Sequence, residues 1–448
     1  MVFLPHTPDE KQSMLDALGL QTENDLFHMV PAQLQNPAIE FPPALTEMEI
    51  SQVMQAAAAK NAGSQCVSFL GGGAYSHFIP QAAAAILSRG DFSTAYTPYQ
   101  PEVSQGTLQS IFEFQTMVSR LTGMDACNAG VYDGASALAE GALMACRAAR
   151  KDAILIAGAI NPHYRRVLQT YLGAPGVKLI EIAAVDGATD IQALKDALSD
   201  NVAACFVQYP NYYGIIEPLE EIGALIKDSK ALLGVSAYPH ALGVLKTPGA
   251  WGADIVTGDL QPMGIPLSYG GPYAGYVACT EKYVRQLPGR LVGQTKDEDG
   301  KTGYVLTLQT REQHIRRSKA TSNICTNQAL CALAATVYLA LMGPKGLRDA
   351  ASLSVKRAHQ LQQTLCELEG VSLAYDKPFF NEFILRLPLS AKQFCATAKQ
   401  HGLLPGIQLP DENQLLVCAT ELTSSSDITL YKRVLSEALQ QAGQPALA

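Results

Sequence analysis

Short apolar runs alternate with helix-length segments through the middle of the chain, from about residue 65 to residue 340. In chain order the runs are CVSFL, AILIAG, VKLIEIA, VAACFVQY, ALLGVSA, ADIVTGD and YAGYVACT. Helices that connect buried strands of this kind cover the faces of a parallel sheet. The pattern therefore predicts a large α/β domain, residues 65–340, around a mostly parallel seven-stranded sheet.

The two ends of the chain follow other patterns. In residues 1–64, Thr7 and Thr46 each precede a Glu by three residues ahead of an apolar-periodic segment, an arrangement typical of a helix capping box. These residues are predicted to form an N-terminal helical arm. Residues 341–448 are predicted to form a small C-terminal α+β domain, with a helix at 353–369, strands near VSLAYD, EFILRLP and QLLVCAT, a helix from about 390 and a closing helix.

Composition and charge exclude several classes of protein. Of the 448 residues, 48% are hydrophobic and 17% charged, as in a compact globular protein, and the net charge of −8 offers no basic field to nucleic acid. The ten cysteines form no CxxC pair and no cluster with His at metal-ligand spacing, which favours free thiols. The start, MVFLPHTPDEKQ, lacks the features of a secretory signal. The longest apolar run, at 329–342, is short for a bilayer span and is interpreted as a core helix. We expect a cytoplasmic protein without a nucleic-acid, membrane or metal partner.

Two glycine-containing motifs do not match nucleotide-binding fingerprints. After CVSFL, the run GGGAYS has Ser76 where a dinucleotide fingerprint needs its last glycine. DEDGKTG contains Gly-Lys-Thr, but a P-loop would need a glycine in place of Thr295. We interpret the first motif as a tight turn and the second as an exposed hairpin or loop.

Five segments resemble the glycine decarboxylase, or P-protein, family of the glycine cleavage system. They are FLGGGAYSHFIP, TAYTPYQPEVSQGTLQSIFEFQT, YDGASALAEGALMACRA, SYGGPYAGY and RRSKATSNICTNQAL. The resemblance extends along the whole chain and implies the fold of the fold-type-I pyridoxal-phosphate enzymes. That family occurs as one long chain of two related halves or as two separate subunits, and this chain has the length of the N-terminal half, subunit 1.

The resemblance also implies an activity and its partners. In the family's reaction, pyridoxal 5'-phosphate serves the decarboxylation of glycine, and the aminomethyl group passes to the lipoyl arm of H-protein. The chain is therefore expected to work only in a complex, with two copies each of subunit 1 and subunit 2. Lipoylated H-protein and glycine are the other expected partners.

The chemistry of pyridoxal phosphate allows a test on the residues. The cofactor needs a lysine for its aldehyde, an acid beside its pyridine nitrogen and a helix N-terminus for its phosphate. The phosphate turn is expected at Tyr132–Ser136, but Asp133 there is interpreted mainly as an N-cap whose charge would repel phosphate. The acid is replaced by Ser236, and the lysine is absent near Gln261 and Pro262. We therefore predict no catalytic residue in this chain and a cofactor bound covalently by subunit 2.

The segment from Tyr96 to Glu102 is the first candidate for a contribution to a shared pocket. It holds two tyrosines, an amide and a carboxylate between two prolines that restrict the backbone. Tyr96, Tyr99, Gln100 and Glu102 are predicted to line the cofactor or substrate pocket at the subunit interface. From residue types alone, a surface turn that packs its own tyrosines is an equal alternative.

A second candidate precedes the apolar helix at 329–342. Ser322 and Asn323 are predicted as further pocket-lining residues, and Arg316 and Lys319 as contacts for a carboxylate or phosphate. A solvated face or interchain ion pairs would explain the same charges, since cations near a helix start oppose its dipole. The uncharged stretch 320–344 is expected to pack in the subunit interface.

Two other functions remain open from the sequence. One is a self-sufficient pyridoxal lyase or transaminase that uses an unrecognised lysine, for which Lys319 is the best candidate. The other is a scaffolding subunit that only stabilises its partner.

Overall fold

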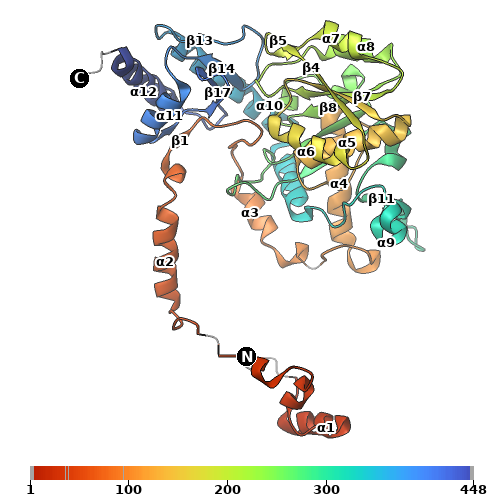
Figure 1. Cartoon of the computed structure of the whole chain (residues 1–448). Coiled ribbons are helices and arrows are strands. Elements are labelled where there is room, and N and C mark those ends of the chain that lie inside the picture. Colours follow the sequence, from red (N-terminus) through yellow and green to blue (C-terminus); the bar gives the residue numbers. More distant parts are fainter. Residues whose placement is uncertain (1–4, 36, 39, 94, 444–448) are drawn as a thin grey trace. The chain divides into compact units, whose positions relative to one another are not determined.

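A computed structural model describes residues 5–35, 37, 38, 40–93 and 95–443 (Figure 1). The chain divides into two compact units, Met1–Ser64 and Gln65–Ala448. In the first unit, α1 spans Pro8–Leu18 and α2 spans Glu47–Ala59. Both predicted capping boxes are present, each with a Thr hydroxyl that accepts from a backbone N–H and a Glu that accepts in return. Among the described residues of this unit only Leu15 is buried.

The second unit contains the predicted α/β sheet of seven strands. Its order is β2 (Ala126–Cys127), β10 (Gly275–Cys279), β9 (Ile255–Asp259), β8 (Leu232–Ala237), β7 (Val202–Tyr209), β3 (Ala153–Ala157) and β4 (Lys178–Ile182). The neighbours from β9 to β4 are parallel, and β10 is antiparallel to both β9 and β2. The sheet is thus mostly parallel, which confirms the predicted fold class.

The prediction is wrong for one strand of this sheet. The run CVSFL forms β1 (Val67–Ser68), which pairs in parallel with β15 (Leu403–Leu404) beside the small domain. Phe69, 1% exposed, packs into the apolar core of that domain. The seventh strand is the two-residue β2, too short to give a pattern in the sequence. Apolarity predicted that CVSFL is buried, but its partner is chosen by contacts distant in the chain.

Helices cover both faces of the large sheet. One face carries α5 (Gly134–Ala149) and α6 (Pro162–Gly173), which lie together over the strands in Figure 1. The other face carries α4 (Gln105–Thr122), α7 (Ile191–Ala197), α8 (Leu219–Lys227) and the first half of α10 (Ala329–Cys366). Side chains of successive strand residues point to opposite faces, so Ile154 and Ile156 contact the first group and Leu155 the second.

Helix α10 joins the large and small domains. The separate helices predicted at 329–342 and 353–369 follow one another in it, with a break at Gly343, whose φ of 59° is left-handed. Among the described residues it is the one helix long and apolar enough to cross a bilayer. It packs instead against α4 and α3 (Gln81–Leu87), and residues such as Ala335 and Tyr338 are fully buried. Its apolarity therefore serves the protein core.

The small domain packs helices on a four-stranded antiparallel sheet. The strands are, in order, β13 (Ser372–Leu373), β14 (Glu382–Arg386), β17 (Gln414–Cys418) and β16 (Ile407–Gln408), and the helices are α11 (Ala391–Gln400) and α12 (Ser425–Gly443). The segment DEDGKTG turns between β11 (Leu291–Lys296) and β12 (Thr302–Thr307), so the predicted hairpin is confirmed. The short strands β5 (Ala184–Val185) and β6 (Ala188–Thr189) form a separate antiparallel pair.

Candidate functional site

The carboxyl edge of the large sheet is the first place to examine, because open α/β sheets bind ligands there. A cavity at this edge is lined by side chains from the ends of β7, β8 and β9 and from the loop after β1, among them Tyr75, Gln208, Ser236 and Asp259. Its volume is only about 30 Å³, room for about one water molecule. A pyridine ring with a phosphate does not fit.

Carboxylates fill the start of α5, where a phosphate would be held. Asp133 is the N-cap, and its Oδ1 accepts from the Ser136 N–H at 2.7 Å. Asp259, at the end of β9, accepts the Gly134 N–H at 2.8 Å. The Tyr164 hydroxyl covers the same turn, because a Cβ on Gly134 would stand 2.3 Å from its oxygen. The predicted N-cap is confirmed, and Asp259 is a second carboxylate that the sequence analysis did not identify.

Burial and hydrogen bonding have opposite effects on the pKa of the buried Asp259 carboxyl. Burial, together with the nearby charge of Asp133, raises its pKa to about 7, although backbone donors, including the N–H groups of Gly134 and Gln261, oppose the rise. A phosphate dianion added at this turn would meet two acidic groups. The start of α5 is therefore closed to phosphate both sterically and electrostatically.

The position expected for the Schiff-base lysine holds a glutamine with no free polar atom. Gln261 Nε2 donates to the carbonyls of Tyr75 at 2.8 Å and Ile265 at 2.9 Å, and its Oε1 accepts from the Tyr75 N–H at 2.8 Å. Gln261 is 2% exposed. Ser236, in place of the acid, lines the same small cavity. Pyridoxal phosphate therefore does not fit the residues at this edge.

The Tyr96–Gln100 segment forms a wall of a different, open cleft of about 720 Å³. Tyr96, Tyr99 and Gln100 line it together with Cys325 and Thr326. A hydrogen bond of 2.8 Å joins the hydroxyls of Thr97 and Thr326, which both line the cleft. The structure thus brings together two segments that are more than two hundred positions apart. Tyr96 is 85% exposed, so its ring is available to another molecule.

A buried arginine forms hydrogen bonds to two of the residues that line this cleft. The Arg290 guanidinium donates to the Tyr99 hydroxyl at 3.2 Å and to the Cys325 sulfur at 3.5 Å. Its Nε lies 3.7 Å from the carboxylate of Glu312, and both side chains are almost fully buried. An ion pair between buried groups needs good geometry to offset desolvation. The Arg290 Nε and one Glu312 carboxylate oxygen have no hydrogen-bond partner among the described residues, so the hydrogen bonds of the guanidinium, rather than the ion pair, hold Tyr99 and Cys325 in place.

The remaining predicted site residues lie outside the lining of this cleft. Glu102 and Asn323 are exposed, and the Ser322 hydroxyl donates to the buried Glu140 carboxylate at 2.7 Å. Burial raises the pKa of Glu140, and Ser322 opposes the rise. Arg316 is exposed and donates to the Thr310 carbonyl, and Lys319 is exposed. Among these residues, Ser322 has a structural role that residue type alone did not indicate.

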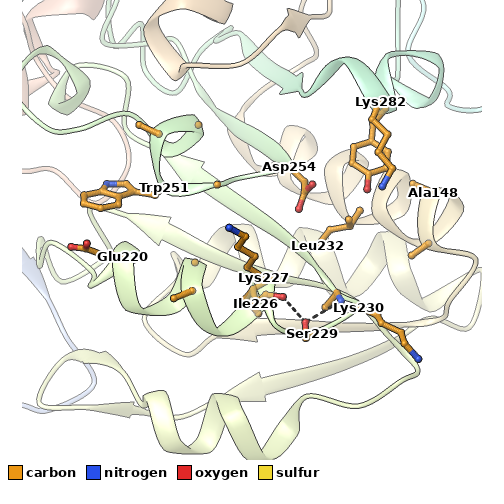
Figure 2. Close-up of a pocket in the computed structure, with 18 of the residues that line it drawn as sticks. Ala148, Glu220, Ile226, Lys227, Ser229, Lys230, Leu232, Trp251, Asp254 and Lys282 are labelled. Carbon is orange, nitrogen blue, oxygen red and sulfur yellow. Dashed lines mark hydrogen bonds between the residues drawn. The ribbon is translucent and has the colours of Figure 1, made fainter.

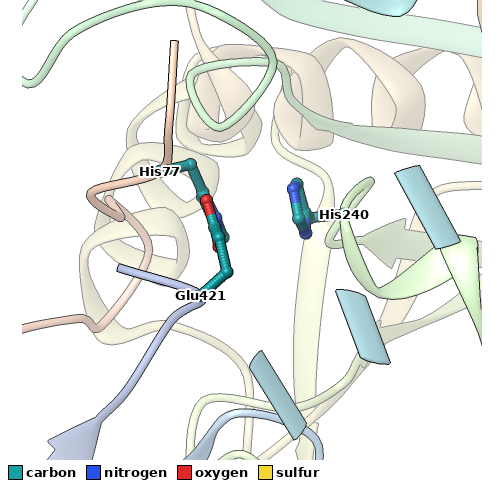
Figure 3. Close-up of side chains that lie close together, drawn as sticks. All are labelled: His77, His240 and Glu421. Atoms are coloured by element: carbon teal, nitrogen blue, oxygen red, sulfur yellow. The ribbon is translucent and has the colours of Figure 1, made fainter. Parts of the chain in front are cut away.

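A third cluster joins His77, His240 and Glu421 (Figure 3). Their ligand-type atoms lie within 4.8 Å of one another, but the two imidazole rings are stacked 3.9 Å apart at 17°, so their in-plane lone pairs do not converge on one metal ion. Both His77 nitrogens are also engaged, with Glu421 at 2.7 Å and the Tyr238 hydroxyl at 2.5 Å. Burial lowers the pKa of His240 to about 3, so its ring is neutral. The cluster therefore has a structural role, because its hydrogen bonds join His77 to Glu421 and Tyr238.

The sequence analysis missed Arg290, Glu312 and the histidine cluster for different reasons. Arg290 lies in the apolar segment LPGRLVG. A charged residue in such a segment indicates that its side chain is buried together with a partner of opposite charge. Glu312 belongs to the charged run REQHIRR, in which nothing distinguishes a buried acid from an exposed one. His77 and Glu421 are 344 positions apart, so no local pattern links them.

Comparison with known proteins assigns the whole chain to one group. The family model described as glycine cleavage system P-protein matches residues 1–435. A probable glycine dehydrogenase (decarboxylating) subunit 1 of Desulforamulus reducens is 49% identical over 437 residues, covering 96% of this chain and 98% of that protein. The protein of the same name from Chloroherpeton thalassium is 46% identical and covers 98% and 100%.

Solved structures give the same result. A crystal structure of glycine decarboxylase (P-protein) of the glycine cleavage system, in inhibitor-bound form, matches with a TM-score of 0.90 and 43% identity, over 98% of this chain and 100% of that one. Oryza sativa TDC with PLP and tryptamine shares the fold at a TM-score of 0.67 and 10% identity, over 99% and 100%. The fold is that of the fold-type-I pyridoxal-phosphate enzymes, and the chain belongs to the glycine cleavage system P-protein family.

Proposed function

We propose that this chain is subunit 1 of a two-subunit glycine decarboxylase, in which subunit 2 holds pyridoxal phosphate covalently. The observation that carries the proposal is the closure of the carboxyl edge by the chain's own side chains. Asp133 and Asp259 take the place of phosphate, and Gln261 stands with all its polar atoms bonded where a lysine is needed. The relatives from Desulforamulus reducens and Chloroherpeton thalassium, which align with nearly all of this chain, carry the name subunit 1.

We propose that this chain contributes residues that line one side of the pocket in which the reaction takes place. Pyridoxal phosphate, bound by subunit 2, would supply the electron sink for loss of CO2 from glycine. The exposed ring of Tyr96 and the amide of Gln100 would face that site across the interface, and Arg290 would keep Tyr99 in place behind them. A wall of this kind orients the substrate and excludes water, which assists the chemistry without a reacting group.

The proposal includes the wider assembly. Two copies of each subunit would bind lipoylated H-protein, which accepts the aminomethyl group near the cleft. We also propose a cytoplasmic location, in keeping with a sequence whose cysteines form no CxxC pair. The alternative of a self-sufficient enzyme using Lys319 has little support, because Lys319 lies in an exposed turn and is absent from the lining of either cavity.

Covalent trapping tests which subunit holds the cofactor. The assembled complex is loaded with pyridoxal phosphate and reduced with borohydride, and the pyridoxyl group is located by mass spectrometry of peptides. We expect it on a lysine of subunit 2 and on none of the 18 lysines of this chain. A stoichiometric pyridoxyl group on Lys319, or on any other lysine of this chain, would falsify the proposal.

Substitution of Gln100 separates a pocket wall from a scaffold. In the assembled complex, Gln100→Ala is expected to reduce glycine–CO2 exchange about tenfold or more, because an orienting contact is lost. Gln192→Ala, on the exposed face of α7, is the matched control and should keep full exchange. Size-exclusion chromatography verifies assembly. Full exchange by an assembled Gln100→Ala complex would favour a scaffolding role.

A further inference from the structure

A second large cleft lies at the amino edge of the sheet, opposite the edge described above. Its volume is about 1030 Å³, at the upper end of the range of ligand pockets. Its lining includes Lys151 just before β3, Leu232 at the start of β8 and Asp254 just before β9, together with the last turn of α8. The proposed reaction uses none of these residues.

The cleft is basic in a chain whose net charge is −8. Five lysines and two carboxylates, Glu220 and Asp254, are among its lining residues. The lysines are Lys151, Lys227, Lys230, Lys246 and Lys282. A concave surface with an excess of one sign of charge, here five lysines against two carboxylates, concentrates counter-ions of the other sign.

Two of the lysines have structural partners. Lys151 Nζ donates to the backbone carbonyls of Val202 at 2.8 Å and Lys230 at 3.2 Å. Lys230 Nζ forms an exposed ion pair with Asp200 at 3.0 Å. These contacts account for Lys151 and Lys230 without a ligand.

The other three lysines form no ion pair within the described part of the chain, although the Tyr283 hydroxyl and, less strongly, Asp254 stabilise the charge of Lys282 and raise its pKa. Lys227 has no hydrogen-bond or ion-pair partner within the described part of the chain. Lys246 Nζ lies 3.4 Å from the centre of the Trp251 ring, and Lys282 Nζ lies 5.0 Å from that of Tyr283. A cation over an aromatic face keeps N–H donors free for an anion.

Helix C-termini attract cations, and Lys227 lies in the last turn of α8, so the helix end favours its charge without fixing the position of its ammonium group. The last turn of α8 is closed by Ser229, whose N–H and hydroxyl both donate to the Ile226 carbonyl, the hydroxyl at 2.7 Å. In Figure 2 the Lys227 side chain points away from this turn, into the space between Trp251 and Asp254.

We propose that this cleft binds a small anion with several phosphate groups, a nucleoside polyphosphate or an inorganic polyphosphate. Lys227, Lys246 and Lys282 reach the cleft from three separate segments, so their charges fit a ligand with several adjacent negative groups better than a single carboxylate. The lining comes from four segments of one domain, which gather around one concave site the size of a small ligand rather than along an extended groove.

Trp251 gives a direct test, because it is the single tryptophan of the chain. Titration of the full chain with inorganic pyrophosphate, followed by tryptophan emission, is expected to give a saturable change that weakens as salt rises. Sodium sulfate at the same ionic strength controls for screening. ATP is titrated in parallel: tighter binding of ATP identifies the nucleotide as the preferred source, and equal binding shows that the phosphates suffice.

Variants locate the binding in the cleft. The double variant Lys227→Glu/Lys282→Glu is expected to bind pyrophosphate at least about tenfold more weakly, by charge reversal at two contacts. Lys227→Gln is expected to weaken binding about threefold, which keeps the test valid if the double variant does not fold. Lys195→Glu, at an exposed position of α7 outside the cleft, is the matched control and should bind normally.

Three results would overturn the proposal. One is the absence of a saturable response to both pyrophosphate and ATP at millimolar concentrations. Another is an equal loss of binding in Lys195→Glu and in Lys227→Gln, which would indicate only the net charge of the protein. The third is a response to a polyglutamate peptide without a response to either phosphate compound, which would indicate an acidic protein partner.

Discussion

Two carboxylates, Asp133 and Asp259, decide the chemistry available at the start of α5. The first accepts from the N–H of Ser136 and the second from that of Gly134, so both donors are satisfied within the chain. In a cofactor-binding member of the fold, a phosphate would occupy such a helix start. At the scale of single residues, side chains therefore occupy the place where such a phosphate would bind, and the fold is retained.

Removal of Asp259 should destabilise the protein. Asp259→Ala leaves the N–H groups of Gly134 and Gln261 buried without an acceptor, and we expect the free energy of unfolding to fall by about 2–4 kcal/mol. Urea unfolding followed by circular dichroism measures the change. Asp259→Asn keeps one acceptor oxygen at nearly the same volume and should lose clearly less. Equal losses in the two variants would show that the hydrogen bonds do not carry the effect.

Residue-level prediction succeeded where a local rule applies. Asp133 was identified as an N-cap from its place before small residues that open a helix, and the missing lysine was evident from the order of residues after a strand. Asp259 stands at the end of the same strand, but nothing in the sequence shows that its carboxylate reaches the start of α5, 125 positions earlier.

Helix α10 shows how one backbone position shapes an element. Gly343 has φ 59° and ψ −176°, a combination that is accessible almost only to glycine. The glycine followed by Pro344 breaks the helix and allows its first half to pack on the large sheet and its second half on the small domain. The sequence analysis predicted two separate helices here, at 329–342 and 353–369, but did not identify the Gly-Pro pair that separates them.

Replacement of Gly343 tests this role. Gly343→Ala meets no neighbouring atom but forces an L-residue into the left-handed region, and we expect a loss of about 1–3 kcal/mol in the free energy of unfolding. Gly106→Ala in α4 is the matched control, because that glycine also has open space but no positive φ, and it should be neutral or slightly stabilising. Chemical denaturation measures both, and similar effects of the two variants would contradict the argument.

In the second unit, two buried acids of the small domain hold the loop after β1. Glu382 in β14 accepts from the Gly72 N–H at 2.6 Å and the Tyr75 hydroxyl at 2.7 Å. Glu421, after β17, bonds His77 and the Phe78 N–H, each at 2.7 Å. The loop that these acids hold also covers the small cavity at the carboxyl edge of the large sheet. The closed state of that edge therefore depends on contacts between the two domains.

The Glu421 contact predicts a dependence of stability on pH. Contact with His77 lowers the pKa of Glu421 to about 2, against the opposing effect of burial. A lowered carboxyl pKa contributes stability that is complete above about pH 4.5 and is lost as the pH falls towards 2. Glu421→Gln should therefore reduce the free energy of unfolding by about 3 kcal/mol at pH 7, and the difference from wild type should shrink towards pH 2.

Urea midpoints of both proteins across this pH range measure the effect. Glu437→Gln, which removes a partner of the exposed Arg433, is the matched control and should change stability by less than about 1 kcal/mol. A difference between Glu421→Gln and wild type that stays constant across the range would show that the charge of Glu421 is not the stabilising feature.

Patterns within short stretches of the chain were enough to predict the α/β class, the two capped helices near the N-terminus and the hairpin at DEDGKTG, because each depends on the spacing of neighbouring residues. Partners distant in the chain could not be predicted in this way. The pairing of CVSFL with Leu403–Leu404, the Arg290–Glu312 ion pair and the approach of Asp259 to α5 all depend on packing that closes long loops. The free energy of such contacts exists only in the assembled core, where burial makes an unpaired polar group costly and so selects its partner.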